Sequence, residues 1–436
     1  MIPGETSARP GGTTDWQVHG FASPDFEPVR RVFEENFAHH GESGAAVCVY
    51  RDGRPVVDLW GGRAGRRHSA PWNQDTVGII FSATKGLTGI CALHLADTGL
   101  LDLDAPVAEY WPEFAANRKE RVTVSDLLSH RAGLPGFSRL MTIADMQAWD
   151  PLVEDLAAQP VAWEPGTAHG YHAFTFGWLV GEVVRRISGL TPGRYLREKI
   201  CDPSGLDIWF GLPPAERHRY APVEQNFHRE TGDDDEYQDF LDELDRLAPT
   251  RAKSPLLQRL GATMMRGGPL RAAAEKSLAR KLNHVQLSDT QRAFLTLFLT
   301  IDDLNSKRLL DIEFPAGNAI CSARSLAKLY ASLIGAVDGR RLLSPEIVAR
   351  AATRISDGRD RVLLTTTSFG LGFMLPGSAE CTRWGDGAFG HPGNGGSVGF
   401  ADPNRNMAFG YCPKRITPIS HYVRPERLIR ATYECL

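Results

Sequence analysis

Residues with strand character lie near both ends of this chain, and the long stretch between them has the spacing of helices. Near the N-terminus, 45–50 and 55–60 are rich in β-branched and aromatic residues, and Asp52-Gly53 between them is typical of a hairpin turn. The strand candidates near the C-terminus are 369–375, 396–401 and 406–412. Since helical patterns separate the two groups, we predict one sheet built from both ends of the chain, with a helical subdomain inserted.

Apolar residues recur at helical spacing outside these strands. Helices are expected over 24–39, 82–98, 123–130, 143–159, 175–188, 192–200 and 423–433. The fold class is therefore α/β (α+β), an antiparallel sheet flanked by helices. The expected parts are a flexible tail over 1–20, a sheet domain from 21–90 plus 360–436, and an all-helical subdomain over 91–359.

Within that subdomain, segment 224–300 differs in composition, because it opens acidic and turns basic. Such a charge sequence is usually a solvated helical excursion. The alternatives are a lid over the active site and a dimer contact, and the sequence does not decide among the three.

Charge and cysteine usage limit the partners of the chain. A net charge of -3 gives no bias toward nucleic acid or an anionic membrane. No apolar run is long enough to cross a bilayer, and the first 20 residues contain no apolar stretch that could form the core of a signal peptide. The seven cysteines are scattered and never form a CxxC pair, which is typical of buried thiols in a reducing compartment. We expect a cytoplasmic protein with no nucleic-acid or membrane partner; a homo-oligomer stays open.

The pentad 81–85 (FSATK) carries the strongest chemical pattern. Ser82 and Lys85 stand three residues apart near the start of a predicted helix, so their side chains share a face. A serine hydroxyl becomes a nucleophile when a base takes its proton, and a lysine is such a base if burial lowers its pKa. Most isolated pairs of this kind are a capping serine and a surface lysine. Gly86 and Gly89, expected to leave the backbone bare where a substrate approaches, favour the catalytic interpretation.

Several stretches resemble the serine β-lactamase and penicillin-binding-protein superfamily, most closely its class C-like esterases, the family VIII carboxylesterases. The matching stretches are 82–88 (SATKGLT), 99–107 (GLLDLDAPV), 127–135 (LLSHRAGLP) and 317–324 (GNAICSAR). The resemblance covers nearly the whole chain except the tail and segment 224–300. It implies a β-lactamase-like fold and an acyl-serine intermediate on Ser82.

The second motif of that superfamily is similar to the stretch around Tyr171. This residue follows 164–167 (EPGT) and inherits the role of the catalytic tyrosine, which would relay the serine proton to the leaving group. The neighbouring His172 is expected to contact the substrate. Ala173 stands where β-lactamases carry an asparagine. A core or rim tyrosine is the alternative interpretation.

The third motif resembles 390–396 (GHPGNGG), with histidine in place of the lysine of β-lactamases. The resemblance places His391 and Gly393 in substrate binding. It also assigns the oxyanion hole to the backbone N–H groups of Ser82 and Asn394. A hydrogen-bonded residue at the end of a strand is the alternative for His391.

Two other patterns suggest different chemistry. The stretch 395–399 (GGSVG) satisfies the nucleophile-elbow pattern around Ser397, but the following residues predict strand and turn rather than the required helix. The histidines at 39, 40, 68, 169 and 172 lack metal-ligand spacing, and no phosphate-binding or dinucleotide-binding loop is present. We therefore expect no metal and no cofactor.

These observations predict a serine hydrolase that cleaves small-molecule carboxylic esters. Ala173 and His391 depart from the β-lactamase pattern, so ester hydrolysis fits better than β-lactam hydrolysis. The alternative is an acyltransferase of secondary metabolism, in which the same acyl-enzyme meets an amine or alcohol instead of water. A non-catalytic binding protein is disfavoured because Ser82, Lys85 and Tyr171 are all present.

Overall fold

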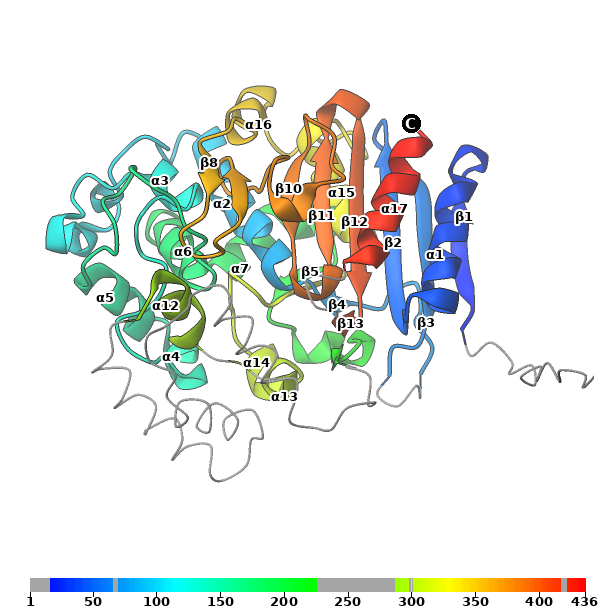
Figure 1. Ribbon diagram of the computed structural model, residues 1–436, viewed down its shortest axis with the longest axis horizontal. Helices are drawn as coiled ribbons and strands as arrows, with labels where there is room; N and C mark the ends of the chain where they lie inside the picture. The colour runs from blue at the N-terminus through cyan, green and yellow to red at the C-terminus, as the bar shows by residue number, and fades with distance from the viewer. Residues whose placement is uncertain (1–15, 66–69, 226–286, 298, 300, 417–421) are drawn as a thin grey trace, which may run out of the picture.

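The computed structural model describes residues 16–65, 70–225, 287–297, 299, 301–416 and 422–436. One side of the molecule contains a six-stranded antiparallel sheet in the order β1-β3-β2-β12-β11-β10 (Figure 1). Its strands are β1 (Val18–Ala22), β2 (Gly44–Arg51), β3 (Arg54–Gly62), β10 (Phe389–Pro392), β11 (Val398–Asp402) and β12 (Met407–Pro413). Three strands come from each end of the chain, so the prediction of one sheet built from both ends is confirmed.

The N-terminal half of the sheet is a hairpin with a third strand at its edge. Asp52 and Gly53 join β2 to β3 with φ angles of 50° and 74°, as the predicted two-residue turn requires. β1 pairs with β3 from Val18 onward. The prediction of a flexible tail over 1–20 is therefore wrong for its last three residues, which are paired in the sheet. Residues 1–15 lie outside the described residues.

Alternate residues of the central strands face two separate cores. On β2, Val47 and Val49 join one apolar cluster, whereas Cys48 and Tyr50 join the cluster on the opposite face. The helices α1 (Glu27–His39) and α17 (Val423–Glu434) pack against each other over the first face (Figure 1). The second face is covered by α15 (Ala323–Ile334). α15 lies within the range predicted as the helical subdomain, but it packs against β2, β11 and β12 and so belongs to the layers of the sheet.

The inserted part of the chain is mainly helical and is arranged around α2. Its helices are α2 (Thr84–Asp97), α3 (Val124–Leu128), α4 (Ile143–Ala148), α5 (Asp150–Ala158), α6 (Thr175–Ser188), α7 (Pro192–Tyr195), α8 (Asp202–Ser204), α12 (Asp289–Leu295), α13 (Ile301–Leu304), α14 (Lys307–Leu310) and α16 (Pro345–Ala351). α2 contacts α6, α7 and α16 as well as β10, and most of its residues are buried. The start of α2 is thus held where the helical part meets the sheet.

Two of the predicted helices are interrupted. The helix expected over 143–159 ends at Trp149, whose φ of 65° separates α4 from α5. Pro151 gives the physical reason, since a proline inside a continuous helix would lack its hydrogen bond and clash with the preceding turn. The helix expected over 192–200 passes from α7 into a π-helical turn over Leu196–Cys201.

The prediction of an all-helical inserted part is wrong, because short strands lie within it and pair with each other or with strands outside it. β4 (Gly78–Ile79), β7 (Ala319–Cys321) and β5 (Ile208–Phe210) form a small antiparallel sheet; β8 (Ser356–Arg359) and β9 (Thr366–Phe369) form a hairpin; β6 (Glu224–Gln225) and β13 (Arg415–Ile416) pair in parallel. The strand predicted over 369–375 therefore ends at its first residue, where Gly370 and Gly372 turn the chain.

Most of the charged segment 224–300 lies outside the described residues, so its predicted helical excursion is not described. Within the described residues, no helix combines the length and apolar character needed to span a membrane.

Candidate active site

Ser82 and Lys85 lie together where the chain enters α2. Ser82 is partly exposed in a single 3-10 turn, Phe81–Ala83, directly before the helix. The Lys85 Nζ lies 3.2 Å from the Ser82 Oγ and donates a second hydrogen bond to the Ala316 carbonyl at 2.9 Å. Lys85 is fully buried, and no carboxylate forms an ion pair with it in the part of the chain that the structure describes. Burial therefore lowers the pKa of Lys85 well below its usual value.

The loop before β7 holds this side of α2 in place. The backbone N–H of Ala319 donates to the Thr84 hydroxyl at 2.9 Å, and the Thr88 hydroxyl donates to the Pro315 carbonyl at 2.5 Å. Ala316 lies between these two anchors and accepts from Lys85. Its role is carried by a backbone carbonyl, so no side-chain pattern in the sequence indicates it.

The structure brings Tyr171 to the same place from a segment far away in the chain. The Lys85 Nζ lies 4.8 Å from the centre of the Tyr171 ring. Burial raises the pKa of the Tyr171 phenol, and a hydrogen bond with the Ser82 side chain partly offsets this rise. Ser82, Lys85 and Tyr171 therefore form one cluster, as the sequence analysis predicts.

His391 lies beside this cluster at the edge strand β10. Its ring centre is 6.0 Å from that of Tyr171, and its Nδ1 lies 2.6 Å from the Pro392 carbonyl oxygen. The ring is buried, and its Nε2 has no hydrogen-bond partner among the described residues. Burial, and then the charge of Lys85, lower the pKa of His391 to about 3. His391 is therefore neutral near pH 7, unlike the lysine that it replaces.

The segment after His391 packs directly against the turn that carries Ser82. A methyl group built on Gly393 would lie 2.2 Å from the Ile80 carbonyl oxygen and 3.1 Å from the Ala83 nitrogen, so only glycine allows this approach. Asn394 follows and is exposed. The N–H of Ser82 lies in the first helical turn, where no helical carbonyl is available to accept from it. This closeness of the two segments is what the predicted oxyanion hole needs.

His172 is engaged within the fold rather than with a substrate. Its Nε2 accepts from the Leu134 N–H at 3.0 Å, and its Nδ1 lies 2.7 Å from the Gly170 carbonyl oxygen. Both ring nitrogens are therefore used, and the structure does not support the prediction that His172 contacts the substrate. Burial lowers the pKa of His172 to about 4.

Ser397 holds two segments together and is not a nucleophile on a turn before a helix. Its side chain is buried, donates to the Ile80 carbonyl at 2.7 Å, and is followed by the strand β11.

Gly86 and Gly89 were predicted to lie on the substrate side of α2, and this prediction is wrong. A methyl group on Gly86 would meet the Tyr330 hydroxyl at 2.3 Å, and one on Gly89 would meet the backbone of Gly372 at 2.9 Å. These glycines permit close packing of α2.

No three His, Cys, Asp or Glu side chains gather as metal ligands in the described ranges. The groups that lie around Ser82 are an amine, a phenol and a neutral imidazole. Together they form a nucleophile with a base and a proton relay, which suits acyl transfer.

Known proteins resemble this chain over nearly its whole length. Residues 29–433 match the family described as Beta-lactamase. The chain is 34% identical over 431 residues to the esterase/beta-lactamase LipL of Mycobacterium tuberculosis, covering 94% of this chain and 86% of that protein. A solved family VIII carboxylesterase has a TM-score of 0.78 and 34% identity, over 96% of this chain and 100% of the other.

A relative with a different activity matches a smaller share of the chain. It is the monacolin J acid methylbutanoyltransferase of Aspergillus terreus, 31% identical over 181 residues, which cover 35% of this chain and 43% of that protein.

Proposed function

This chain belongs to the beta-lactamase family and is a serine hydrolase of carboxylic esters, and we propose that Ser82 is its nucleophile. The single observation that carries this proposal is the hydrogen bond of 3.2 Å between the Ser82 hydroxyl and a fully buried lysine. A lysine whose pKa is lowered by burial is deprotonated often enough to act as a base.

The proposed acylation step begins with neutral Lys85. Its Nζ takes the proton of Ser82 while the Oγ forms a bond to the ester carbonyl carbon, and the negative charge moves onto the carbonyl oxygen. The N–H groups of Ser82 and Asn394 bind that oxygen. When the bond to the alcohol oxygen breaks, Lys85 gives the proton to that oxygen, directly or through the Tyr171 phenol, and becomes neutral again. In deacylation, Lys85 takes a proton from a water molecule whose oxygen bonds to the acyl carbon. It gives that proton to the Ser82 Oγ as the bond between Oγ and the acyl carbon breaks, which releases the acid and restores Ser82.

The substrate in this proposal is a small-molecule ester rather than a β-lactam. Ala173 offers no amide group at the position where β-lactamases carry asparagine, and neutral His391 offers no positive charge where they carry lysine. Transfer of the acyl group to an alcohol or amine is the second candidate, supported by the methylbutanoyltransferase among the relatives. The two reactions differ only in what attacks the acyl-enzyme.

Hydrolysis of p-nitrophenyl acetate and butyrate by the wild type and by Ser82→Ala tests the proposal. The variant should lose at least about 10³-fold in kcat with an unchanged circular dichroism spectrum. A variant that keeps most of its activity would exclude Ser82 as the nucleophile. Product analysis with added alcohols and amines separates the two candidates, because only an acyltransferase forms mostly new ester or amide at low acceptor concentration.

A further inference from the structure

The segment that carries Tyr171 belongs to no helix or strand, yet its backbone is fixed at three consecutive residues. The N–H of Gly170 donates to the His130 carbonyl at 3.1 Å. The N–H of Tyr171 donates to the Asp360 Oδ1 at 3.0 Å. The N–H of His172 donates to the His130 Nδ1 at 3.1 Å. His130 and Asp360 therefore determine where the backbone of Tyr171 lies, although neither is hydrogen-bonded to its phenol.

His130 is placed so that both its carbonyl and its ring face this segment. It follows α3 with a φ of 61°, in the left-handed region that non-glycine residues seldom adopt and in which asparagine, aspartate and histidine are enriched. Its ring is buried, with its centre 5.1 Å from that of Tyr171 and 4.5 Å from that of Phe369. Because Nδ1 accepts a hydrogen bond, the ring must be neutral with its proton on Nε2. Burial, and then the charges of neighbouring histidines and Lys85, keep the pKa of His130 well below 6.5, so this acceptor persists near pH 7.

Asp360 is a fixed acceptor even without Tyr171. Its carboxylate is fully buried, and the same Oδ1 accepts from the N–H groups of Val362 at 2.7 Å and Leu363 at 2.8 Å. The other oxygen accepts from the Thr367 hydroxyl at 3.0 Å. Since three donors other than Tyr171 hold this carboxylate, the N–H of Tyr171 binds to a group that does not move with it.

We propose that His130 and Asp360 are positioning residues for the reaction, which hold the Tyr171 phenol against Ser82 and Lys85. The inference rests on the proposed function, because it assigns them a kinetic effect only if Tyr171 takes part in proton transfer. Proton transfer needs donor and acceptor within hydrogen-bond reach, and a misplacement of about 1 Å costs on the order of 100-fold in rate. Both residues act on the rate through Tyr171 and not by contact with the substrate.

The test compares His130→Leu with His130→Asn in ester hydrolysis. The leucine variant has no acceptor, so kcat should fall by about 10–100-fold with little change in KM. Asparagine places an oxygen near the position of Nδ1 and tolerates a positive φ, so it should recover kcat to within about 5-fold of the wild type. Recovery by asparagine is not expected if His130 only fills space.

A double-mutant cycle with Tyr171→Phe shows whether the effect passes through the phenol. Once the phenol is removed, His130→Leu should cost no further activity. An equal loss in both backgrounds would overturn the inference. A Tyr171→Phe enzyme with unchanged kcat would instead refute the role of Tyr171 in the proposed function, while Ser82→Ala still reports on the nucleophile.

A matched variant controls for a general loss of stability, and a variant at a second site tests the inference if His130→Leu does not fold. His94→Leu removes a half-buried histidine of α2 whose Nδ1 lies 2.8 Å from the Tyr195 hydroxyl, and it should keep kcat. If His130→Leu does not fold, Asp360→Asn takes its place in the cycle. Its neutral oxygen is a weaker acceptor for the N–H of Tyr171, so kcat should fall by about 3–10-fold in the wild type and not in Tyr171→Phe. A loss that persists in Tyr171→Phe, or no loss in the wild type, would overturn the inference.

Discussion

The chemistry of a single residue, Lys85, depends on what surrounds it. A lysine on a surface is charged at pH 7 and has no free electron pair for a proton. Lys85 is fully buried, with a hydroxyl and a carbonyl as its hydrogen-bond partners and no carboxylate in an ion pair among the described residues. Burial therefore disfavours its charged form and makes a base of it.

A pH profile of hydrolysis tests this assignment. The pKa of Lys85 lies well below 10.5, so kcat/KM should rise with pH through that lowered pKa and reach its plateau well before pH 10.5. Lys85→Arg keeps the positive charge but does not deprotonate, so its activity should be at least about 10³-fold lower at every pH. An arginine variant with the wild-type profile would show that another group is the base.

His172 should make the folded protein sensitive to acid. The pKa of His172 is about 4 in the folded protein and 6.5 when the side chain is free. Between these two pH values the unfolded chain therefore binds a proton at His172 and the folded chain does not. Stability should therefore be highest above pH 6.5 and fall as the pH drops toward 4, by about 3 kcal/mol for this residue alone. Urea unfolding of the wild type and of His172→Gln across this range checks the prediction, since the variant should lose part of the slope. An identical slope would contradict it.

The sequence predicted some site residues and missed others for physical reasons. Ser82 and Lys85 are neighbours on one helical turn, so their spacing alone brings them together. Tyr171 comes from a distant segment and was assigned only through a family resemblance. The contribution of Ala316 is a carbonyl, which every residue has. His172 serves the fold because its ring nitrogens meet two backbone groups, the N–H of the distant Leu134 and the carbonyl of the nearby Gly170.

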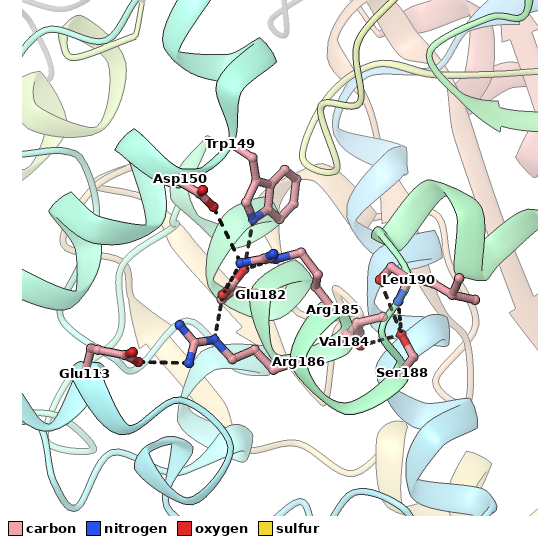
Figure 2. Close-up of polar contacts among 9 residues, drawn as sticks. All are labelled: Glu113, Trp149, Asp150, Glu182, Val184, Arg185, Arg186, Ser188 and Leu190. Carbon is pink, nitrogen blue, oxygen red and sulfur yellow. Dashed lines mark hydrogen bonds and ion pairs between the residues drawn. The ribbon is translucent and has the colours of Figure 1, made fainter.

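At the scale of elements, the break between α4 and α5 shows where tertiary contacts override local spacing. Trp149 has a positive φ, and its Nε1 donates to the buried carboxylate of Glu182 on α6 at 2.8 Å (Figure 2). Glu182 also binds Arg185 and Arg186, the latter pairing further with Glu113. The apolar period of 143–159 contains no information about this partner on another helix. Pro151 was the one local signal of the break.

Removing the carboxylate should destabilise the helical part without changing the chemistry. Glu182→Ala leaves the Trp149 Nε1 without its acceptor, while Arg185 and Arg186 still reach solvent. We therefore expect a loss of about 2–3 kcal/mol in the free energy of unfolding, with kcat of the folded enzyme within about 2-fold of the wild type. Glu198→Ala, which breaks an exposed pair with Arg194, is the control and should cost less than about 0.5 kcal/mol. Equal losses in both variants would contradict the expectation.

At the scale of the whole molecule, the order of the strands brings the two ends of the chain into one sheet. The pairing of β2 with β12 joins strands from opposite ends, and the sequence predicted this closure because strand patterns appear only near the termini. The helix α15 was not among the predicted helices. Even an amphipathic pattern there would show which face of the helix is buried but not that the sheet covers it. Two cores, one on each face, depend on the same central strands.

A buried ion pair connects α17 to the segment directly before β2. The Arg424 Nη1 donates to the Glu42 Oε1 at 3.0 Å, and both side chains are almost completely buried. The second oxygen of Glu42 accepts from the Tyr411 hydroxyl on β12, and the Asn36 side chain on α1 donates to the Arg424 carbonyl at 3.2 Å. These contacts join the first helix, the last helix and the central strand pair.

Arg424→Met should therefore weaken the molecule as a whole and not its C-terminal helix alone. The substitution leaves the Glu42 carboxylate buried without the cation that faces it, which costs about 3–5 kcal/mol. Because β11 and β12 contribute residues both to the core that contains α17 and to the core that contains α2, the loss should appear in one cooperative transition. Guanidinium unfolding followed by far-ultraviolet circular dichroism and by esterase activity should then give coincident midpoints, both lower than in the wild type. If α17 were instead a separable element, part of the helical signal would disappear at a denaturant concentration where the Ser82 site still hydrolyses its ester.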